Sequence, residues 1–207
     1  VFYPSAMSPI IDLVNTLPVE DWKSYMTYRF ITDSANVLSE EIDQEAFHFY
    51  STVLNGVPEQ RERWERGVAR VGSLGSLGEA IGQIYVQRHF PESAKAQMDD
   101  LVENLRTALR QSIEQNDWMG AATKEEAYKK VEAFRPKIAY PDEWEDFSSL
   151  DLSRDSLFQN AQNVREFNYA DEISRLGEPT DREEWGMTPQ TVNAYYNPSF
   201  NEIVFPA

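Results

Sequence analysis

Only two histidines, His48 and His89, could bind a metal through an imidazole nitrogen or act as a general base near neutral pH. His48 follows Glu45 at the Glu-x-x-His spacing that di-iron helical bundles use. Such a site needs a second pair of this kind and two further glutamates, and the residue three positions before His89 is Val86. The pattern therefore favours buried or half-buried packing histidines over a metal centre.

Acidic pairs at 40–41, 99–100 and 125–126 lie on the solvated faces of expected helices. Adjacent helical residues point about 100° apart, so the two carboxylates of a pair are not directed at the same proton or metal. The chain has no cysteine, which excludes disulfides, thiol catalysis and cysteine-ligated zinc. Thr180 and Glu183 have capping-box spacing, a structural feature of a helix start.

The stretch "GSLGSLGEAIG" places glycines at 72, 75, 78 and 82. A phosphate-binding loop would follow a hydrophobic strand and would be followed by a lysine or a helix terminus directed at the anion. Here a charged helix precedes the glycines and no lysine follows them. We therefore expect a break between two helices, with close packing of backbone.

The last twenty residues, "TPQTVNAYYNPSFNEIVFPA", change the apolar period from helical to alternating. The runs 191–196 and 202–205 read as two strands joined by the turn "NPSFN", which is a β-hairpin. An edge strand can add an extended peptide as a further strand, and the Asn193 amide could hold a peptide backbone from the side. The alternative is simple pairing of the hairpin with other strands of a sheet.

Helical patterns fill the rest of the chain and predict a mainly α protein. The expected helices cover 19–38, 40–56, 58–72, 91–117, 122–134 and 151–177. The first is apolar on two faces, which is typical of a helix buried between neighbours. Gly56 and Gly177 are expected to end the helices at 40–56 and 151–177. Pro58 is expected to begin the helix at 58–72, and Pro136 to stop the helix at 122–134. In the helix at 91–117, Leu101, Leu105 and Leu109 belong to the expected inward stripe, and Arg106 to the solvent face.

The charge balance limits the partners. The 35 acidic and 19 basic residues give a net charge of −16, which disfavours nucleic acid and anionic lipid. No run of about 18 apolar residues could span a membrane, and the N-terminus lacks the pattern of a signal peptide. The chain also starts without methionine, so we expect a piece of a longer protein.

The ending "VNAYYNPSFNEIVFPA" closely resembles the neprilysin-like zinc metalloendopeptidases, peptidase family M13. Other blocks match in the same order: "LPVEDWKSYMTYRF", "GEAIGQIYVQRHFP", "DWMGAATKEEAYKKVEAFRPKIAYPDEW" and "DREEWGMTPQTVNAYYNP". The resemblance covers nearly the whole chain, with bacterial members as the nearest match. In "GSLGSLGEAIG" the sequence departs from the asparagine-containing turn that is common before Gly-Glu-Ala in relatives.

The resemblance implies a thermolysin-like α+β catalytic domain capped by a helical domain that restricts the site to peptides. Zinc is held in the family by a His-Glu-x-x-His motif and a later glutamate, and the glutamate of the motif activates the water. By the same match, Asn193 and Ala194 would hold the substrate backbone, and Tyr195 would border the pocket.

This chain contains no His-Glu-x-x-His, so we expect no catalytic or metal-binding residue in it. The resemblance implies an interdomain or catalytic-domain segment at 1–25, a helical cap at 26–160, and the start of the catalytic domain at 161–207. The parent would be a zinc-dependent metalloendopeptidase of oligopeptides, periplasmic, secreted or membrane-anchored, and the rest of its catalytic domain would be this chain's partner. The chain alone would bind no zinc and be inactive. The alternative is a non-catalytic helical module for peptide or protein interaction, derived from the same family.

Overall fold

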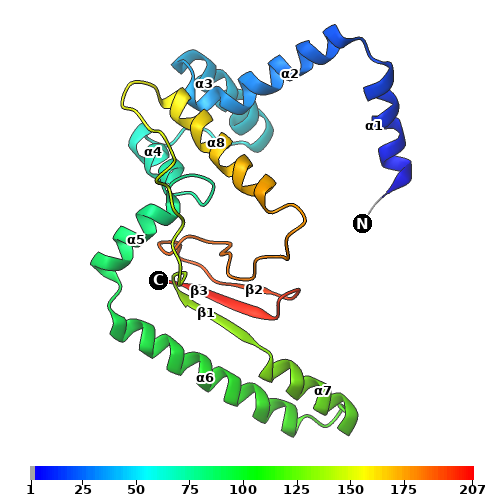
Figure 1. The fold of residues 1–207 in the computed structure, drawn as a ribbon, viewed down its shortest axis with the longest axis vertical. Helices are drawn as coiled ribbons and strands as arrows, with labels where there is room; N and C mark the ends of the chain where they lie inside the picture. Colours follow the sequence, from blue (N-terminus) through cyan, green and yellow to red (C-terminus); the bar gives the residue numbers. More distant parts are fainter. Residues whose placement is uncertain (1–2) are drawn as a thin grey trace. The chain divides into compact units, whose positions relative to one another are not determined.

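The structure is a computed structural model that describes residues 3–207. Its α-helices are α1 (Pro4–Thr16), α2 (Val19–Ser34), α3 (Glu40–Phe47), α4 (Arg63–Val71), α5 (Gly78–His89), α6 (Glu92–Gln115), α7 (Ala121–Glu132) and α8 (Leu157–Ser174). A 3₁₀ turn, η1 (Ala35–Val37), and a π-helical segment, η2 (His48–Val53), follow α2 and α3. The strands are β1 (Arg135–Ala139), β2 (Tyr195–Asn197) and β3 (Glu202–Pro206) (Figure 1). The prediction of a mainly α protein with C-terminal strands is confirmed.

The chain forms two compact units. One consists of the residues up to Arg61 together with Leu152–Asn163, and the other of Glu62–Asp151 together with Val164–Ala207. The sheet, α4–α7 and the C-terminal hairpin all belong to the second unit. That unit therefore carries the residues that the sequence singles out for binding.

Helix α2 in the first unit is more exposed than its sequence predicts. Tyr25, Met26 and Tyr28 are 53%, 63% and 54% exposed, and burial is confined to the C-terminal end of the helix and η1, at residues such as Ala35 and Val37. The expectation of a helix buried on two faces is wrong for this chain. A two-sided apolar pattern shows what a helix can bury, and among residues 3–207 the neighbouring elements cover these side chains only in part.

The predicted helix at 40–56 forms as α3 followed by η2, and Gly56 ends it as expected. Gly56 has φ +70° and its N–H donates to Thr52 O at 3.0 Å. This left-handed conformation carries no steric cost for glycine, because it has no Cβ.

Helix α4 begins at Arg63 and not at Pro58, so the predicted start is wrong. Glu62 and Glu65 form a reciprocal capping box, in which the Glu62 N–H donates to Glu65 Oε2 at 3.1 Å. Side-chain acceptors at these two positions satisfy amide groups that a helix start leaves without partners. Pro58 offers only a suitable φ, and the capping box decides the boundary.

The three strands form one sheet in the order β1-β3-β2 (Figure 1). β2 and β3 are antiparallel, with Tyr195 opposite Val204, which confirms the hairpin. β1 was not predicted; it pairs with β3 in parallel, and Ile138 lies opposite Phe205. Pro136 stands in this strand, where an edge position tolerates a residue without an N–H. The hairpin therefore has a sheet neighbour on its β3 side.

One face of the sheet packs against α6. Val102, Ile138 and Ala139 form the buried cluster, and Met98 and Phe205 pack against it. Side chains alternate along a strand, so Lys137 and Glu202 point to the face opposite to that of Ile138 and Phe205.

The predicted inward stripe of α6 is only partly buried. Val102 is 2% exposed and Ile113 is 7% exposed, whereas Leu101, Leu105 and Leu109 are 43%, 50% and 48% exposed. Arg106, predicted to face water, instead donates to Phe134 O at 3.1 Å. A stripe of apolar residues marks the face of a helix, but the neighbouring elements determine how much of that face is covered.

Candidate functional site

Neither histidine is buried, so the prediction of packing histidines is wrong. His48 opens η2 and is exposed; His89 ends α5, is exposed, and lies 5.4 Å from the Tyr85 ring centroid. Within residues 3–207, no group of three or more histidine, cysteine, aspartate or glutamate side chains is arranged to hold a metal ion.

The glycine-rich stretch lies between two helices and allows close packing of backbone, as predicted. A Cβ at Gly78 would lie 2.6 Å from Thr188 Cγ2, and one at Gly82 would lie 2.6 Å from Pro189 Cδ. Both glycines are buried in α5. Their missing side chains let the segment 188–190 approach the helix closely, and we call this feature the glycine notch.

Asn193 and Ala194 are exposed and lie immediately before β2. The Asn193 N–H donates to Thr191 O at 3.0 Å, and the Ala194 N–H donates to Asn193 Oδ1 at 2.8 Å. The predicted strand at 191–196 therefore shortens to 195–197. An asparagine side chain can hydrogen-bond to nearby backbone groups that would otherwise pair with a neighbouring strand. Here such a local turn takes the place of strand pairing at 191–194.

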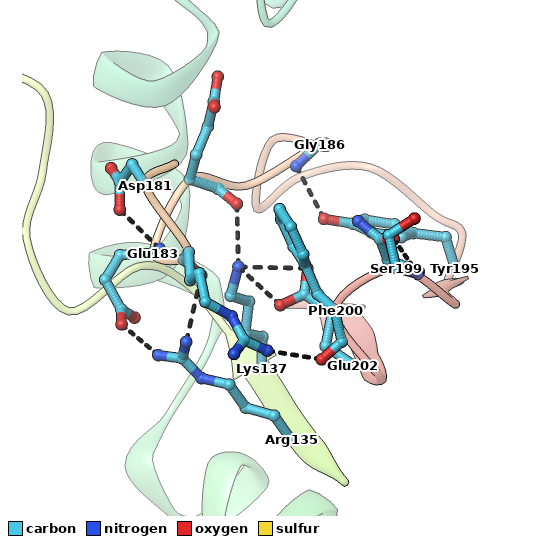
Figure 2. Close-up of polar contacts among 12 residues, drawn as sticks. Arg135, Lys137, Asp181, Glu183, Gly186, Tyr195, Ser199, Phe200 and Glu202 are labelled. Carbon is cyan, nitrogen blue, oxygen red and sulfur yellow. Dashed lines mark hydrogen bonds and ion pairs between the residues drawn. The ribbon is translucent and has the colours of Figure 1, made fainter. Parts of the chain in front are cut away.

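Tyr195 begins β2 and points back toward the preceding loop (Figure 2). Its phenol oxygen accepts a hydrogen bond from the Gly186 N–H at 2.8 Å. Burial raises the pKa of the Tyr195 phenol above 10.0, and the Gly186 hydrogen bond acts in the opposite direction. The phenol is therefore neutral at physiological pH and serves as an anchor for the strand.

A buried ion pair joins Lys137 of β1 to Glu202 of β3 (Figure 2). Lys137 Nζ is 3.2 Å from Glu202 Oε2 and 3.4 Å from Oε1, and only the more distant oxygen has hydrogen-bond geometry. The side chains are 5% and 2% exposed. Lys137 Nζ also donates to Glu184 O at 2.9 Å, which ties the 181–186 segment to β1 and β3.

Further contacts tie the same segment to the sheet and hairpin (Figure 2). Arg135 forms an ion pair with Glu183, and Arg182 Nη2 donates to Phe200 O at 2.6 Å. Asp181 Oδ1 accepts from the Glu183 N–H at 2.8 Å. No helix begins here, so the interpretation of Thr180–Glu183 as a capping box is wrong. The Asp181 carboxylate accepts a hydrogen bond within a turn, and the Glu183 carboxylate pairs with Arg135.

The contacts of Lys137 and Gln190 were not predicted from the sequence. Gln190 Nε2 donates to Gly72 O at 3.1 Å and to Gly78 O at 3.0 Å, across more than a hundred residues of chain. No local period signals such a contact. Lys137 lies between Pro136 and Ile138 in "RPKIA", and these apolar neighbours are the one visible sign that its charge needs a partner.

The strand β2 is an edge of the sheet, because the order is β1-β3-β2. Tyr196 is 43% exposed and Val192, just before the strand, is fully exposed. The arrangement places an unpaired strand edge beside the amide of Asn193 and the backbone of Ala194, a combination that suits an extended peptide.

Among the described residues, no helix combines the length and the apolar character that crossing a membrane requires.

Known proteins resemble this chain over nearly its whole length. The family model described as "Peptidase family M13" matches residues 1–141. The zinc metalloprotease Zmp1 of Mycobacterium tuberculosis, solved in complex with an inhibitor, is 45% identical with a TM-score of 0.85, over 96% of this chain and 29% of that chain. Human neprilysin is 27% identical over 215 residues, 100% of this chain and 28% of its own length.

An endothelin-converting enzyme homolog from Locusta migratoria is 28% identical over 219 residues, 100% of this chain and 30% of its own length. The chain thus spans about 30% of the length of these curated relatives. Because the family model covers residues 1–141, well over half of the chain, the chain belongs to peptidase family M13.

Proposed function

We propose that this chain is part of a zinc-dependent metalloendopeptidase that cleaves oligopeptides. The family membership and the 45% identity to a zinc metalloprotease support this activity for the parent protein. Zinc would be held by residues of the parent other than 3–207, since these offer no donor set. The parent would act in the periplasm, as a secreted protein or from a membrane anchor.

The binding role falls to the segment that precedes β2. Asn193 would hold the substrate backbone through its side-chain amide and Ala194 through its main-chain carbonyl, while Tyr195 would border the pocket. The observation that carries this assignment is the exposure of Asn193 and Ala194 directly beside an unpaired strand edge. Asn193 Oδ1 already accepts the Ala194 N–H, which leaves Nδ2 to donate to a substrate carbonyl.

The remaining parts would take supporting roles. Residues 1–25 would be an interdomain or catalytic-domain segment, 26–160 a helical cap that restricts access to peptides, and 161–207 the start of the catalytic domain. The rest of that domain would complete the groove.

The test of the binding role uses the full-length enzyme and a peptide substrate. Asn193→Ala should lower kcat/KM about tenfold or more, because it removes a hydrogen bond to a buried substrate backbone. Asn104→Ala, which removes an exposed asparagine of α6, should leave kcat/KM unchanged. Equal activity of the two variants would contradict the assignment.

The test of the enzyme assignment compares metal content and turnover. The full-length protein should contain one zinc and lose peptide hydrolysis on chelation, whereas the 207-residue chain should show neither property. If the full-length protein lacks both zinc and turnover, it is instead a non-catalytic interaction module.

A further inference from the structure

Thr188 and Pro189 are buried against α5 just before the proposed peptide-binding residues, and Gln190 next to them is half-buried. Thr188 is 4% exposed and the Pro189 side chain less than 2%. Pro189 lies against Gly82, where a Cβ would come within 2.6 Å of its ring. The glycine notch therefore sets how closely this segment approaches the helix.

Gln190 fastens the segment in the notch. Its Nε2 donates to Gly72 O at 3.1 Å and to Gly78 O at 3.0 Å, so both amide hydrogens have acceptors. Gly72 is the C-cap residue of α4 and Gly78 is the first residue of α5, so one side chain joins the termini of two helices to the loop that leads to β2. Its Oε1 is buried and has no partner among the described residues. A buried amide oxygen left in this way costs free energy. The two hydrogen bonds that Nε2 donates are the contacts that set against this cost.

Hydrogen bonds among Thr188, Thr191 and Asn193 fold the backbone on either side of Gln190 into turns. The Thr191 N–H donates to Thr188 O at 3.0 Å, and the hydroxyls of Thr188 and Thr191 are 2.9 Å apart. The Asn193 N–H then donates to Thr191 O at 3.0 Å. Two residues in hydrogen-bonded turns separate the glutamine from the asparagine, which leaves the backbone little freedom to adjust between them.

The other end of the segment is held by Tyr195. Its phenol accepts the Gly186 N–H, and its backbone pairs with β3 opposite Val204. Asn193 and Ala194 thus lie between two fixed points while remaining exposed themselves. A binding group held in this way loses little conformational freedom when a substrate arrives.

We propose that Gln190 is a positioning residue that orients Asn193 and Ala194 for the substrate backbone. This inference rests on the proposed function, since it assigns Gln190 an effect that acts through Asn193. It deepens that function by naming what places the binding groups.

A double-mutant cycle in the full-length enzyme tests this role. Gln190→Met keeps the length of the side chain and removes both donated bonds, and should lower kcat/KM about threefold to thirtyfold. In an Asn193→Ala background the same change should have almost no further effect, because a residue that acts through Asn193 has nothing left to position. Gln111→Met, at an exposed glutamine of α6, is the matched control and should be fully active.

Thr191→Val gives a milder variant that removes only the hydroxyl contact with Thr188, and should show a smaller loss with the same dependence on Asn193. Zinc content and the thermal unfolding midpoint, measured on every variant, identify any variant that does not fold.

The outcomes separate the two proposals. The positioning role is wrong, while the binding role stands, in two cases. In the first, Asn193→Ala lowers activity but Gln190→Met does not. In the second, Gln190→Met lowers activity equally in the wild-type and Asn193→Ala backgrounds. If Asn193→Ala is fully active, the binding role is wrong and the role of Gln190 falls with it.

Discussion

Lys137 and Glu202 show how single residues hold the sheet to its neighbouring loop. They come from adjacent strands, and Lys137 also donates to the Glu184 carbonyl. Taking two charges out of water is costly, and the attraction between them offsets that cost only while both are present. The pair and the bond to Glu184 O together link β1, β3 and the 181–186 segment.

Removing one partner should cost more than removing both. Lys137→Met leaves the Glu202 carboxylate buried and unpaired, and should destabilise the protein by about 3–5 kcal/mol. The double variant Lys137→Met with Glu202→Leu should recover much of this loss. Unfolding midpoints of the wild-type and variant full-length proteins measure both effects. A single variant as stable as the wild type would show that the carboxylate finds another partner.

The Arg135–Glu183 pair predicts a dependence of stability on pH. The hydrogen bond from Arg135 lowers the pKa of the Glu183 carboxyl below 4.5 in the folded protein. A lowered folded-state pKa contributes stability above the unfolded value, and this is lost as the pH falls through the folded value.

Glu183→Gln should therefore be less stable than the wild type at pH 7, with the difference shrinking below pH 4.5. Unfolding midpoints across this range measure it. Glu178→Gln, at an exposed glutamate without an ion pair among the described residues, should show no such trend. A difference for Glu183→Gln that does not change with pH would contradict the linkage.

At the scale of elements, α5 and the segment 188–190 depend on a spacing of four between two glycines. Gly78 and Gly82 lie one turn apart on the same face of α5, against Thr188 and Pro189. Glycine lowers the intrinsic stability of a helix. Its presence at both positions is explained by the close approach of Thr188 and Pro189 to α5, which leaves no room for a Cβ.

A comparison of two glycines tests this packing. Gly82→Ala should destabilise the protein by about 1–3 kcal/mol, because its Cβ would overlap the Pro189 ring. Gly67→Ala, in α4, should stabilise it by about 0.5–1 kcal/mol, since nothing lies within 4 Å of the added Cβ. Thermal unfolding of both variants provides the measurement, and a stabilising Gly82→Ala would show that the notch can widen without cost.

At the scale of the whole molecule, large apolar side chains remain exposed on α1 and α2. Ile10 and Val14 on α1 are 51% and 57% exposed, and Tyr25 and Met26 on α2 are 53% and 63% exposed. Contiguous exposed apolar surface commonly mediates contacts with other protein molecules, and we expect the same here despite a net charge of −16. The 207-residue chain should therefore associate with itself.

Size-exclusion chromatography at several concentrations tests this association. The elution volume should decrease as concentration rises, and Val14→Glu with Met26→Glu should suppress the change. Thr27→Glu adds one negative charge at an exposed polar position of α2 and should leave the association largely intact. A wild-type monomer at every concentration would contradict the prediction.

The sequence by itself determined the features that depend on neighbouring residues. Helical periods located α6, α7 and α8, Gly56 marked a helix end, and alternation with a turn identified the hairpin. Each signal arises within about two helical turns or one hairpin, where side-chain direction follows from backbone geometry. The ordered motifs also indicated peptidase family M13, which the family comparison confirmed.

Only the tertiary structure decided how these parts meet. It added β1 to the hairpin in parallel, paired Lys137 with Glu202, and inserted Gln190 between two helix termini. It also left α2 and both histidines exposed, against expectation. Parallel pairing, buried charge and burial itself depend on contacts between residues far apart in the chain, and no local period in the sequence encodes them.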